Sequence, residues 1–222
     1  MESARSLPIL EIKNHNRRLY SELPQALVNS PVTAAAMLDS ISLFELMGSK
    51  WMLAVPLSRW DEEIHEHCFD EVRHTKMVQD GAKKLRWSMT SEQILLENEL
   101  NKIFYQTTEA YLSQLSRKIF KLTYLGNRNK QFSLSAYAIL AFLIERRIMK
   151  IYPSLAKHGP NEEIRILAKQ IIKDERKHLG FVDEKLQASL DQLQTDQKTI
   201  IDLEESLADT WMEKLTYAVA NN

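Results

Sequence analysis

Apolar residues recur every three to four positions along most of this chain, which is the spacing of helices that bury one face. Prolines and short polar runs divide the pattern into segments. We predict helices over 31–56 and 61–87, then a long helix over 91–122 that leads to the loop-forming run 126–129. Because only a short turn joins the first two segments, they predict an antiparallel hairpin.

The second half of the chain repeats this arrangement. A helix is predicted to begin soon after the loop 126–129, and the turn 158–161 leads into a partner helix that continues to about residue 188. A short turn again predicts an antiparallel hairpin. The order of hairpin, long helical crossover and hairpin therefore predicts an all-α four-helix bundle.

The predicted helices form a single domain over 1–222, with the bundle core at about 33–188. An amphipathic segment over about 196–219 predicts a C-terminal accessory helix that either covers the bundle or forms a homodimer. A short N-terminal helix is expected over 10–20. With five glycines, six prolines and 44% hydrophobic residues, the composition favours long helices over a sheet protein rich in turns.

The formal net charge of −1 gives no global positive field that would draw nucleic acid or an anionic membrane to the protein. We interpret the basic run 83–86 as a solvated helix end, with contact to a phosphate-bearing substrate, tRNA included, as the alternative. The single cysteine, Cys68, excludes an internal disulfide and a metal site built from several cysteines. No apolar signal core follows the polar N-terminus and no segment approaches the ~20 apolar residues of a membrane span, so we expect a cytoplasmic protein.

A five-residue pattern occurs twice, as Asp-Glu-Val-Arg-His at 70–74 and as Asp-Glu-Arg-Lys-His at 174–178. Residues three apart on an α-helix differ by about 300° of rotation, so the Glu and His of each copy lie side by side on one helix face. A third Glu-x-x-His, at 62–65, lacks the preceding aspartate and a counterpart in the second half, and we interpret it as surface. The predicted metal-ligand pairs are Glu71 with His74 and Glu175 with His178.

A further glutamate interrupts the apolar face of each partner helix, Glu45 in the first hairpin and Glu145 in the second. At 1.5 Å per residue, Glu45 and Glu71 both lie about 15 to 17 Å along their arms from the turn between them, so they are level. The second hairpin brings Glu145 level with Glu175 in the same way. Burying four carboxylates together is strongly unfavourable unless cations neutralise them, and two divalent ions supply the four positive charges. The sequence therefore predicts a two-metal site with six ligands.

Carboxylate oxygens with one imidazole per metal suit iron or manganese, whereas zinc sites prefer more nitrogen or sulfur. Asp70 and Asp174 are expected to accept the free ring N–H of the histidine in the opposite motif, which would fix the orientation of each imidazole. His67 lies one turn before Glu71, but its counterpart in the second half is Ile171. We interpret His67 chiefly as a core histidine, with an additional ligand or a proton relay as the alternative.

Two further positions bear on the predicted site. Gly48 stands where the second half has Ile148, and this asymmetry indicates either a pocket for substrate or a close contact between helices. Tyr152 is interpreted chiefly as a packing residue, with a radical relay beside the metals as the alternative. The asymmetric positions are where we expect substrate preference to reside.

These residues resemble the ferritin-like di-iron carboxylate superfamily, whose bundle supplies one Glu from each of two helices and Glu-x-x-His from each of the other two. The resemblance covers about 33–188 and implies a ferritin-like four-helix bundle that holds two iron ions, with manganese as the alternative. Short segments at 143–145, 71–76 and 173–179 are similar to the small oxygen-activating members, such as aldehyde-deformylating oxygenase and the tRNA-modifying hydroxylase. The ligands that the resemblance implies are Glu45, Glu71, His74, Glu145, Glu175 and His178.

The resemblance implies a non-haem di-iron oxidase or oxygenase that activates O₂ and oxidises a small organic substrate, with electrons from an external donor. Two alternatives stay open. One is a peroxide-handling enzyme similar to manganese catalase or the erythrins, and the other is a metal-binding or storage protein without turnover. The single cysteine argues against rubrerythrin itself, and the second Glu-x-x-His argues against a typical storage ferritin.

Overall fold

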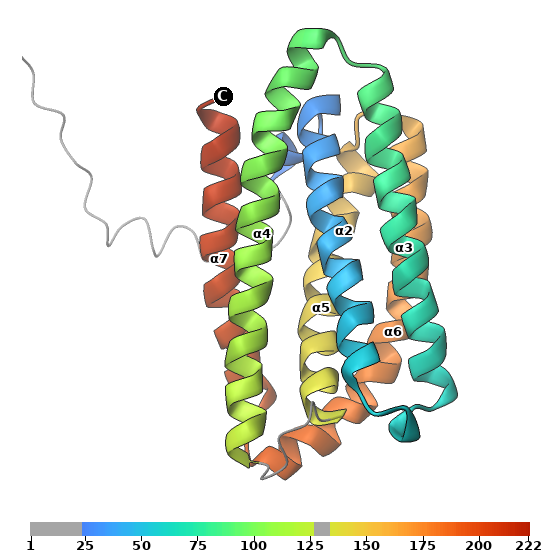
Figure 1. Cartoon of the computed structure of the whole chain (residues 1–222), viewed down its shortest axis with the longest axis vertical. Coiled ribbons are helices and arrows are strands. Elements are labelled where there is room, and N and C mark those ends of the chain that lie inside the picture. Colours follow the sequence, from blue (N-terminus) through green and yellow to red (C-terminus); the bar gives the residue numbers. More distant parts are fainter. Residues whose placement is uncertain (1–23, 127–133) are drawn as a thin grey trace, which may run out of the picture.

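Six α-helices make up most of residues 24–126 and 134–222, the residues that this computed structural model describes, and no strand occurs among them (Figure 1). Short 3₁₀ turns precede the first helix and join the first two. The elements are η1 Gln25–Leu27, α2 Pro31–Ala54, η2 Leu57–Arg59, α3 Glu62–Trp87, α4 Ser91–Gly126, α5 Leu134–His158, α6 Glu162–Leu193 and α7 Gln197–Ala220. The prediction of an all-helical bundle is thus confirmed. The short helix expected over 10–20 and most of the loop 126–129 lie outside the described residues.

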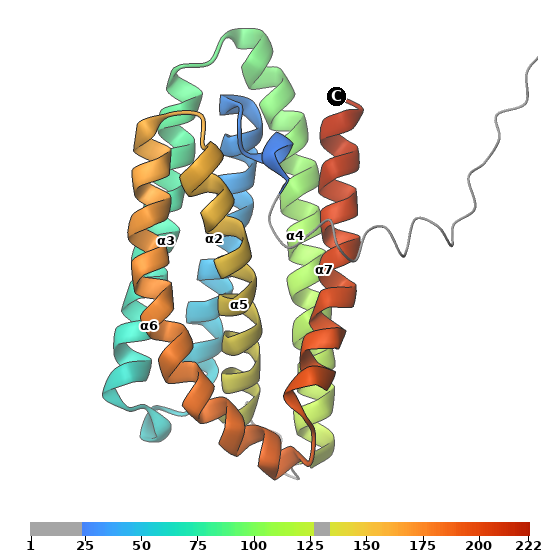
Figure 2. The ribbon, with the colours of Figure 1, turned by 180° about the vertical axis from the view of Figure 1, so that it is seen from behind.

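Two antiparallel hairpins, α2 with α3 and α5 with α6, lie side by side (Figures 1 and 2). The chain leaves α3 at one end of the bundle, and α4 carries it back to the other end, where α5 begins. With 36 residues, α4 spans about 54 Å, which is enough to cross the whole bundle. The long helical crossover therefore brings the second hairpin beside the first.

Five of the described helices begin at a side-chain cap, which satisfies a backbone N–H that the helix itself leaves unpaired. Asp61 caps α3 by accepting a hydrogen bond from the amide of Ile64 at 3.0 Å, and Asn161 caps α6 through the amide of Ile164 at the same distance. These two caps end the turns of the two hairpins. The other three caps are Ser30 of α2, Thr90 of α4 and Asp196 of α7.

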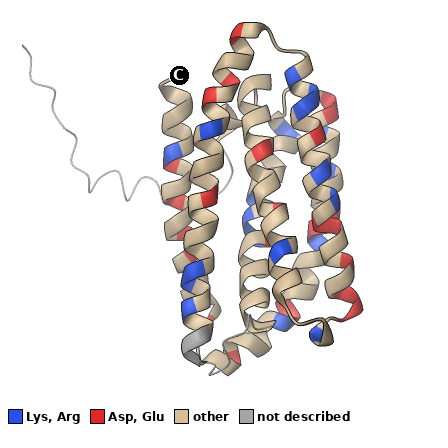
Figure 3. Ribbon diagram, viewed as in Figure 1, with Lys and Arg blue, Asp and Glu red and all other residues tan. Residues whose placement is uncertain are grey.

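Helix α2 is the most apolar of the described helices and lies inside the bundle, in contact with α3, α4 and α5. It is the one described helix that is long and apolar enough to cross a membrane by length and composition, but 78% of the relevant window is buried within the protein. Most of the charged residues lie instead on the surrounding helices (Figure 3). Burial inside the bundle explains the apolar composition of α2.

The C-terminal helix α7 packs against α4, so this helix covers the bundle. A buried ion pair fastens it: Nε and Nη2 of Arg147 on α5 donate to the two carboxylate oxygens of Glu204 on α7, each at 2.8 Å. Tyr111 of α4 donates its hydroxyl hydrogen to Glu204 Oε1 at 2.5 Å. We call Tyr111, Arg147 and Glu204 the arginine–glutamate cluster.

Candidate metal centre

Seven buried side chains from four helices converge inside the bundle, and we call them the carboxylate–histidine cluster. The structure brings together all six predicted ligands and adds His67 to them. Each of the seven has an exposed fraction of 6% or less. The members are Glu45 of α2; His67, Glu71 and His74 of α3; Glu145 of α5; and Glu175 and His178 of α6.

The helices place these polar side chains on faces that are otherwise apolar. On α3, Ile64, Val78 and Leu85 are buried on the same stripe as Glu71 and His74. Because the stripe follows the helical repeat, the core-facing position of the two polar residues is fixed by the apolar residues above and below them. The pair at 62–65, by contrast, is exposed, which confirms its interpretation as surface.

The donor atoms of the cluster form two groups, each of which could hold a metal ion. Within each group, one donor atom from each of four residues lies within 4.8 Å of the others. Glu71 belongs to both groups and therefore lies between the two positions. Position 1 is formed by Glu45, Glu71, His74 and Glu175, and position 2 by His67, Glu71, Glu145 and His178.

Glu175 also faces both positions. Its Oε1 lies 2.8 Å from Nδ1 of His74, and its Oε2 lies 2.9 Å from Nδ1 of His178. The two oxygens of one carboxylate are thus divided between the histidines of the two groups. Glu71 and Glu175 are thus the two glutamates that face both positions.

Two aspartates hold the outward nitrogens of these histidines. His74 Nε2 lies 3.4 Å from Asp174 Oδ2, and His178 Nε2 lies 3.2 Å from Asp70 Oδ2. Each aspartate serves the histidine of the other hairpin, as the sequence predicted. Arg73 donates to both aspartates and so links the two pairs at the outer edge of the cluster.

His67 is not an ordinary core histidine, because its ring contacts the glutamates of the cluster. Its Nε2 lies 2.8 Å from Glu145 Oε1 and 3.2 Å from Glu71 Oε1. Its Nδ1 lies 3.0 Å from the hydroxyl oxygen of Tyr137. Both ring nitrogens are therefore engaged, and one of them faces the carboxylates.

Tyr152 and Gly48 both act on a glutamate of the cluster. The hydroxyl of Tyr152 donates to Glu45 Oε1, so this tyrosine is a hydrogen-bond partner of the cluster as well as a packing residue. A Cβ atom on Gly48 would lie 2.7 Å from Glu71 Oε2, closer than such contacts normally come. The space that Gly48 leaves is thus filled by the Glu71 carboxylate, which favours the close contact over the substrate pocket.

Burial and mutual repulsion control the ionisation of the glutamates. Burial, with the neighbouring charges of Glu45 and Glu175, raises the pKa of Glu71 well above its ordinary value. Burial and the charge of Glu175 do the same to the pKa of Glu145. Burial also opposes ionisation of Glu175, but contacts with Glu145 and the two histidines beside it hold its pKa well below the ordinary value. Without a metal ion, the cluster retains protons on some of its carboxyl groups.

The histidines differ from one another in charge. Burial opposes protonation of His74, yet contacts with Glu175 and Glu45 raise its pKa to about 10. Burial, followed by repulsion from His178, lowers the pKa of His67 to about 3. His67 is therefore neutral at pH 7, which is the form in which an imidazole binds a metal ion.

The fit of a metal ion is supported by polar atoms that find no hydrogen bond. Buried polar atoms in proteins are almost always hydrogen-bonded. Among the residues described, eight buried side-chain nitrogen or oxygen atoms are not, and six of the eight belong to this cluster. These six are Glu45 Oε2, both carboxylate oxygens of Glu71, His74 Nδ1, Glu145 Oε2 and Glu175 Oε1. Glu175 Oε1 and His74 Nδ1 lie 2.8 Å apart and Glu71 Oε1 lies 3.2 Å from His67 Nε2, but neither pair has hydrogen-bond geometry. Oxygens and a ring nitrogen that face one another in this way suit divalent cations.

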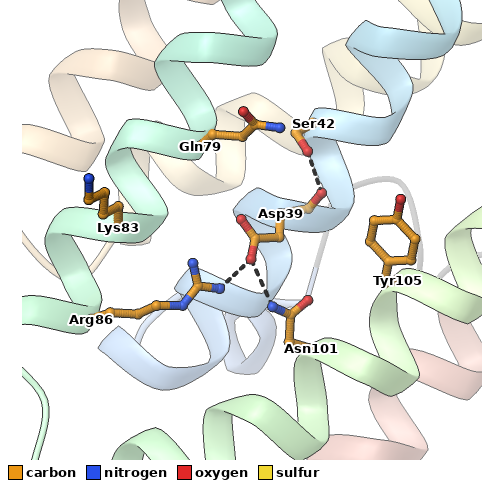
Figure 4. A pocket seen from close by; sticks show the side chains of 7 residues that line it. All are labelled: Asp39, Ser42, Gln79, Lys83, Arg86, Asn101 and Tyr105. Atoms are coloured by element: carbon orange, nitrogen blue, oxygen red, sulfur yellow. Dashed lines mark hydrogen bonds and ion pairs between the residues drawn. The ribbon is translucent and has the colours of Figure 1, made fainter.

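A surface pocket of about 450 Å³ lies between α2, α3 and α4 and is separate from the cluster (Figure 4). Arg86, from the basic run 83–86, donates there to Asp39 and also to Glu97, while Asn101 donates to Asp39 at 2.8 Å. The guanidinium charge is thus balanced by two carboxylates. The lining residues are Asp39, Ser42, Gln79, Lys83, Arg86, Asn101 and Tyr105.

Comparison with known proteins gives no relative for this chain. No family model, no curated protein and no solved structure matches it. What the chain does is therefore inferred from the cluster and from the bundle that holds it.

Proposed function

We propose that this chain belongs to the ferritin-like di-iron carboxylate superfamily and acts as a non-haem di-iron oxidase or oxygenase. The observation that carries the proposal is the set of six buried donor atoms without hydrogen bonds, arranged around two positions that share Glu71. The order of hairpin, helical crossover and hairpin also supports it. So does the distribution of the donors, because two bundle helices each carry one Glu and the other two each carry one Glu-x-x-His.

The donor set matches two iron ions in number and in charge. Four glutamates balance two divalent cations, and carboxylate oxygens with imidazole nitrogens are ligands that iron and manganese accept. Glu45 and His74 would hold an ion at position 1, Glu145 and His178 an ion at position 2, and Glu71 would be shared. When bound, the two ions supply electrons that reduce O₂ and a positive charge that stabilises the reduced oxygen.

The surrounding residues orient the donors and exclude water. Asp174 and Asp70 hold the outward nitrogens of His74 and His178, so that Nδ1 of each faces the cluster. The hydroxyl of Tyr152 holds a proton at Glu45 Oε1. One helical turn away, fully buried isoleucines and valines close the cluster from water: Ile41, Val78, Ile148, Ile171 and Val182.

An oxygenase reaction at this cluster requires electrons from outside the substrate. If one atom of O₂ enters an organic substrate and the other leaves as water, two electrons and two protons are needed beyond those of the substrate. In the proposed reaction an external reductant supplies these electrons. The substrate of the proposed reaction is a small organic molecule, and the electron donor is a separate protein or cofactor.

Metal analysis and oxygen uptake test this proposal. Anaerobic loading with Fe(II) is expected to give two iron ions per chain, and exposure to O₂ is expected to consume O₂ with a transient optical change. The double variant Glu175→Ala/His178→Ala is expected to lose both properties. The matched control is Glu62→Ala/His65→Ala, which removes the exposed Glu-x-x-His of α3 and is expected to behave as the wild type.

The products of the same experiment separate an oxygenase from the alternatives. An oxygenase consumes O₂ without releasing peroxide once substrate and reductant are present. Rapid dismutation of added peroxide by a manganese-loaded protein would assign the chain to the peroxide-handling enzymes. Absence of stoichiometric metal after loading with Fe(II) or Mn(II) would contradict every metal-dependent function considered for this cluster.

A further inference from the structure

We propose that His67 is a third histidine ligand of the centre, bound through Nε2 to the ion at position 2. The two ions would then be unequal, because position 1 would have one imidazole and position 2 would have two. This inference rests on the proposed function in one respect, since it requires that the cluster hold two metal ions. It goes beyond the six-ligand pattern of four glutamates and two histidines.

The first argument is the direction of the His67 ring. Its Nε2 lies 2.8 Å from Glu145 Oε1 and 3.2 Å from Glu71 Oε1, and both glutamates belong to position 2. The His178 ring, which belongs to the same position, has its centroid 4.1 Å from the centroid of His67. The ring of His67 therefore stands beside a ligand histidine and points a nitrogen at the same carboxylates.

The second argument is that His67 repeats the bonding pattern of the other two histidines. His74 and His178 each direct one nitrogen at the cluster glutamates and give the other to an oxygen acceptor, Asp174 or Asp70. His67 does the same, with the hydroxyl oxygen of Tyr137 as its outward partner at 3.0 Å. An N–H at Nδ1 that donates to this oxygen leaves the lone pair at Nε2 free for a metal ion.

The third argument is the asymmetry of the two hairpins. His67 lies four residues before Glu71 on α3, and the residue four before Glu175 on α6 is Ile171, which is fully buried and offers no donor atom. Position 1 therefore has no equivalent of His67. If His67 served only to pack the core, an apolar residue would fill its place as Ile171 does in α6.

A role restricted to hydrogen bonding with Glu145 is the competing explanation, and the number of metal-bound histidines separates the two. Co(II) is a suitable probe, because ring N–H protons of histidines bound to high-spin Co(II) give strongly shifted, exchangeable proton NMR signals. ¹⁵N-labelled histidine identifies these signals as imidazole N–H. The full chain is loaded with two equivalents of Co(II), and bound cobalt is measured by elemental analysis.

We expect three shifted imidazole N–H signals in the wild-type protein. His67→Gln is expected to show two signals. Tyr137→Phe is expected to keep three signals, one of them at a changed shift, because the N–H of His67 has lost the hydroxyl oxygen that accepts it. His65→Gln is the matched control, since His65 is an exposed histidine of the same helix, and it is expected to show three unchanged signals. We also expect His67→Gln to bind one of the two cobalt ions at least about tenfold more weakly than the wild type.

Two shifted signals from a wild-type chain that holds two cobalt ions would overturn this inference while leaving the proposed function intact. An unchanged spectrum in a folded His67→Gln variant would overturn it equally. A wild-type chain that binds fewer than two ions would contradict both the inference and the proposed function. Because the wild-type count alone is decisive, the test does not depend on the stability of the variant.

Discussion

The arginine–glutamate cluster and the carboxylate–histidine cluster both bury charge between helices, but they differ in how that charge is balanced. In the first, one guanidinium meets one carboxylate through two parallel hydrogen bonds of 2.8 Å, and Tyr111 donates a third. In the second, four glutamates meet three histidines, and six donor atoms stay without hydrogen bonds. The first cluster is complete as folded, whereas the second has more carboxylates than positive charges to balance them.

This difference separates a structural role from a ligand-binding role. A buried ion pair whose atoms are all satisfied holds two elements together and needs no further component. A buried group of carboxylates with unsatisfied oxygens is costly to fold alone and becomes favourable when cations bind. Stability of the first cluster is therefore expected to be independent of metal, and stability of the second to depend on it.

The largest effect is expected from Arg147→Met, which leaves the carboxylate of Glu204 buried without its main partner. We expect a loss of about 3–5 kcal/mol in the free energy of unfolding, equal with and without metal. Urea denaturation in EDTA and in Mn(II) measures it. Arg146→Met is the matched control, because Arg146 is more exposed and its loss leaves the bidentate pair intact. A loss below 1 kcal/mol for Arg147→Met would show that α7 is held chiefly by apolar packing.

The next effect is expected from Glu175→Ala, which removes a donor that faces both metal positions. Wild-type protein is expected to gain about 2.7 kcal/mol in stability for each ion bound, when free metal exceeds the dissociation constant of that site a hundredfold. The variant is expected to gain almost nothing, because it no longer binds the ions. Thermal unfolding at several Fe(II) or Mn(II) concentrations under argon measures the gain, and Glu62→Ala serves as control. Full metal occupancy in Glu175→Ala would contradict its role as a ligand.

The stability of metal-free protein is expected to fall as pH rises. The pKa values of Glu71 and Glu145 are raised by folding, and that of His74 is raised from 6.5 to about 10. Groups with a raised pKa bind protons more tightly in the folded state, so their stabilisation is full below the unfolded pKa and is lost as pH rises through the folded pKa. The lowered pKa of His67 has the opposite effect, because its contribution is full above the unfolded pKa of 6.5 and is lost as pH falls from there through the folded pKa of about 3.

The urea concentration at the midpoint of unfolding, measured in EDTA at pH 6, 7, 8 and 9, tests this expectation. Histidine and buried carboxyl groups titrate in roughly this pH range. Metal-loaded protein is expected to show the smaller decline, because ions bind the deprotonated donors and metal affinity rises with pH. The arginine–glutamate cluster contributes no slope, since its guanidinium stays charged throughout. Greater stability of metal-free protein at pH 9 than at pH 6 would contradict the protonation that we assign to the carboxylate–histidine cluster.

A smaller effect is expected from Gly48→Ala, compared with Gly180→Ala. Both changes replace a glycine inside a helix by alanine. Without other contacts, this replacement stabilises a helix by about 0.5–1 kcal/mol. A Cβ at Gly180 meets nothing within 4 Å, whereas a Cβ at Gly48 would lie 2.7 Å from Glu71 Oε2 and displace that carboxylate. We expect Gly180→Ala to gain stability with unchanged metal affinity, and Gly48→Ala to bind metal about tenfold more weakly. Equal affinities in a competition titration would show that Glu71 has room to move.

The smallest effect is expected from Arg73→Gln, at the outer edge of the carboxylate–histidine cluster. Arg73 is 49% exposed, and exposed ion pairs contribute about 0–1 kcal/mol, so its loss is expected to change stability by less than 1 kcal/mol. Metal affinity is expected to fall slightly, because Asp70 and Asp174 lose the cation that links them. Lys76→Gln removes another exposed ion pair of α3, with Asp80, and is the control. A large loss of affinity would mean that Arg73 is needed to hold both aspartates.

The helices were predictable because their determinants are local. Apolar spacing and the caps Asp61 and Asn161 fix where α3 and α6 begin, and the expected bounds of the bundle helices agree with the structure to within a few residues. The meeting of Glu45 with the first Glu-x-x-His follows from equal arm lengths in a hairpin. The predicted pairing of each outer aspartate with the opposite histidine depends only on the near-symmetry of the two hairpins.

What the sequence did not reveal depends on contacts between distant elements. His67 has no counterpart in α6, and its second partner, Tyr137, comes from α5, so no local pattern distinguishes it from a core histidine. The glutamate that fills the space at Gly48 comes from the neighbouring helix. Arg147 and Glu204 are 57 residues apart, and apolar periodicity in either helix says nothing of their pairing.

The crossover α4 has a consequence for the order of folding events. It divides the donors into four from the α2–α3 hairpin and three from the α5–α6 hairpin, so that both positions draw donors from each half. Contacts between groups this far apart in sequence close a long loop and form slowly compared with the turns inside each hairpin. High-affinity metal uptake is therefore expected to follow the docking of the two halves, and its rate during refolding would time that docking.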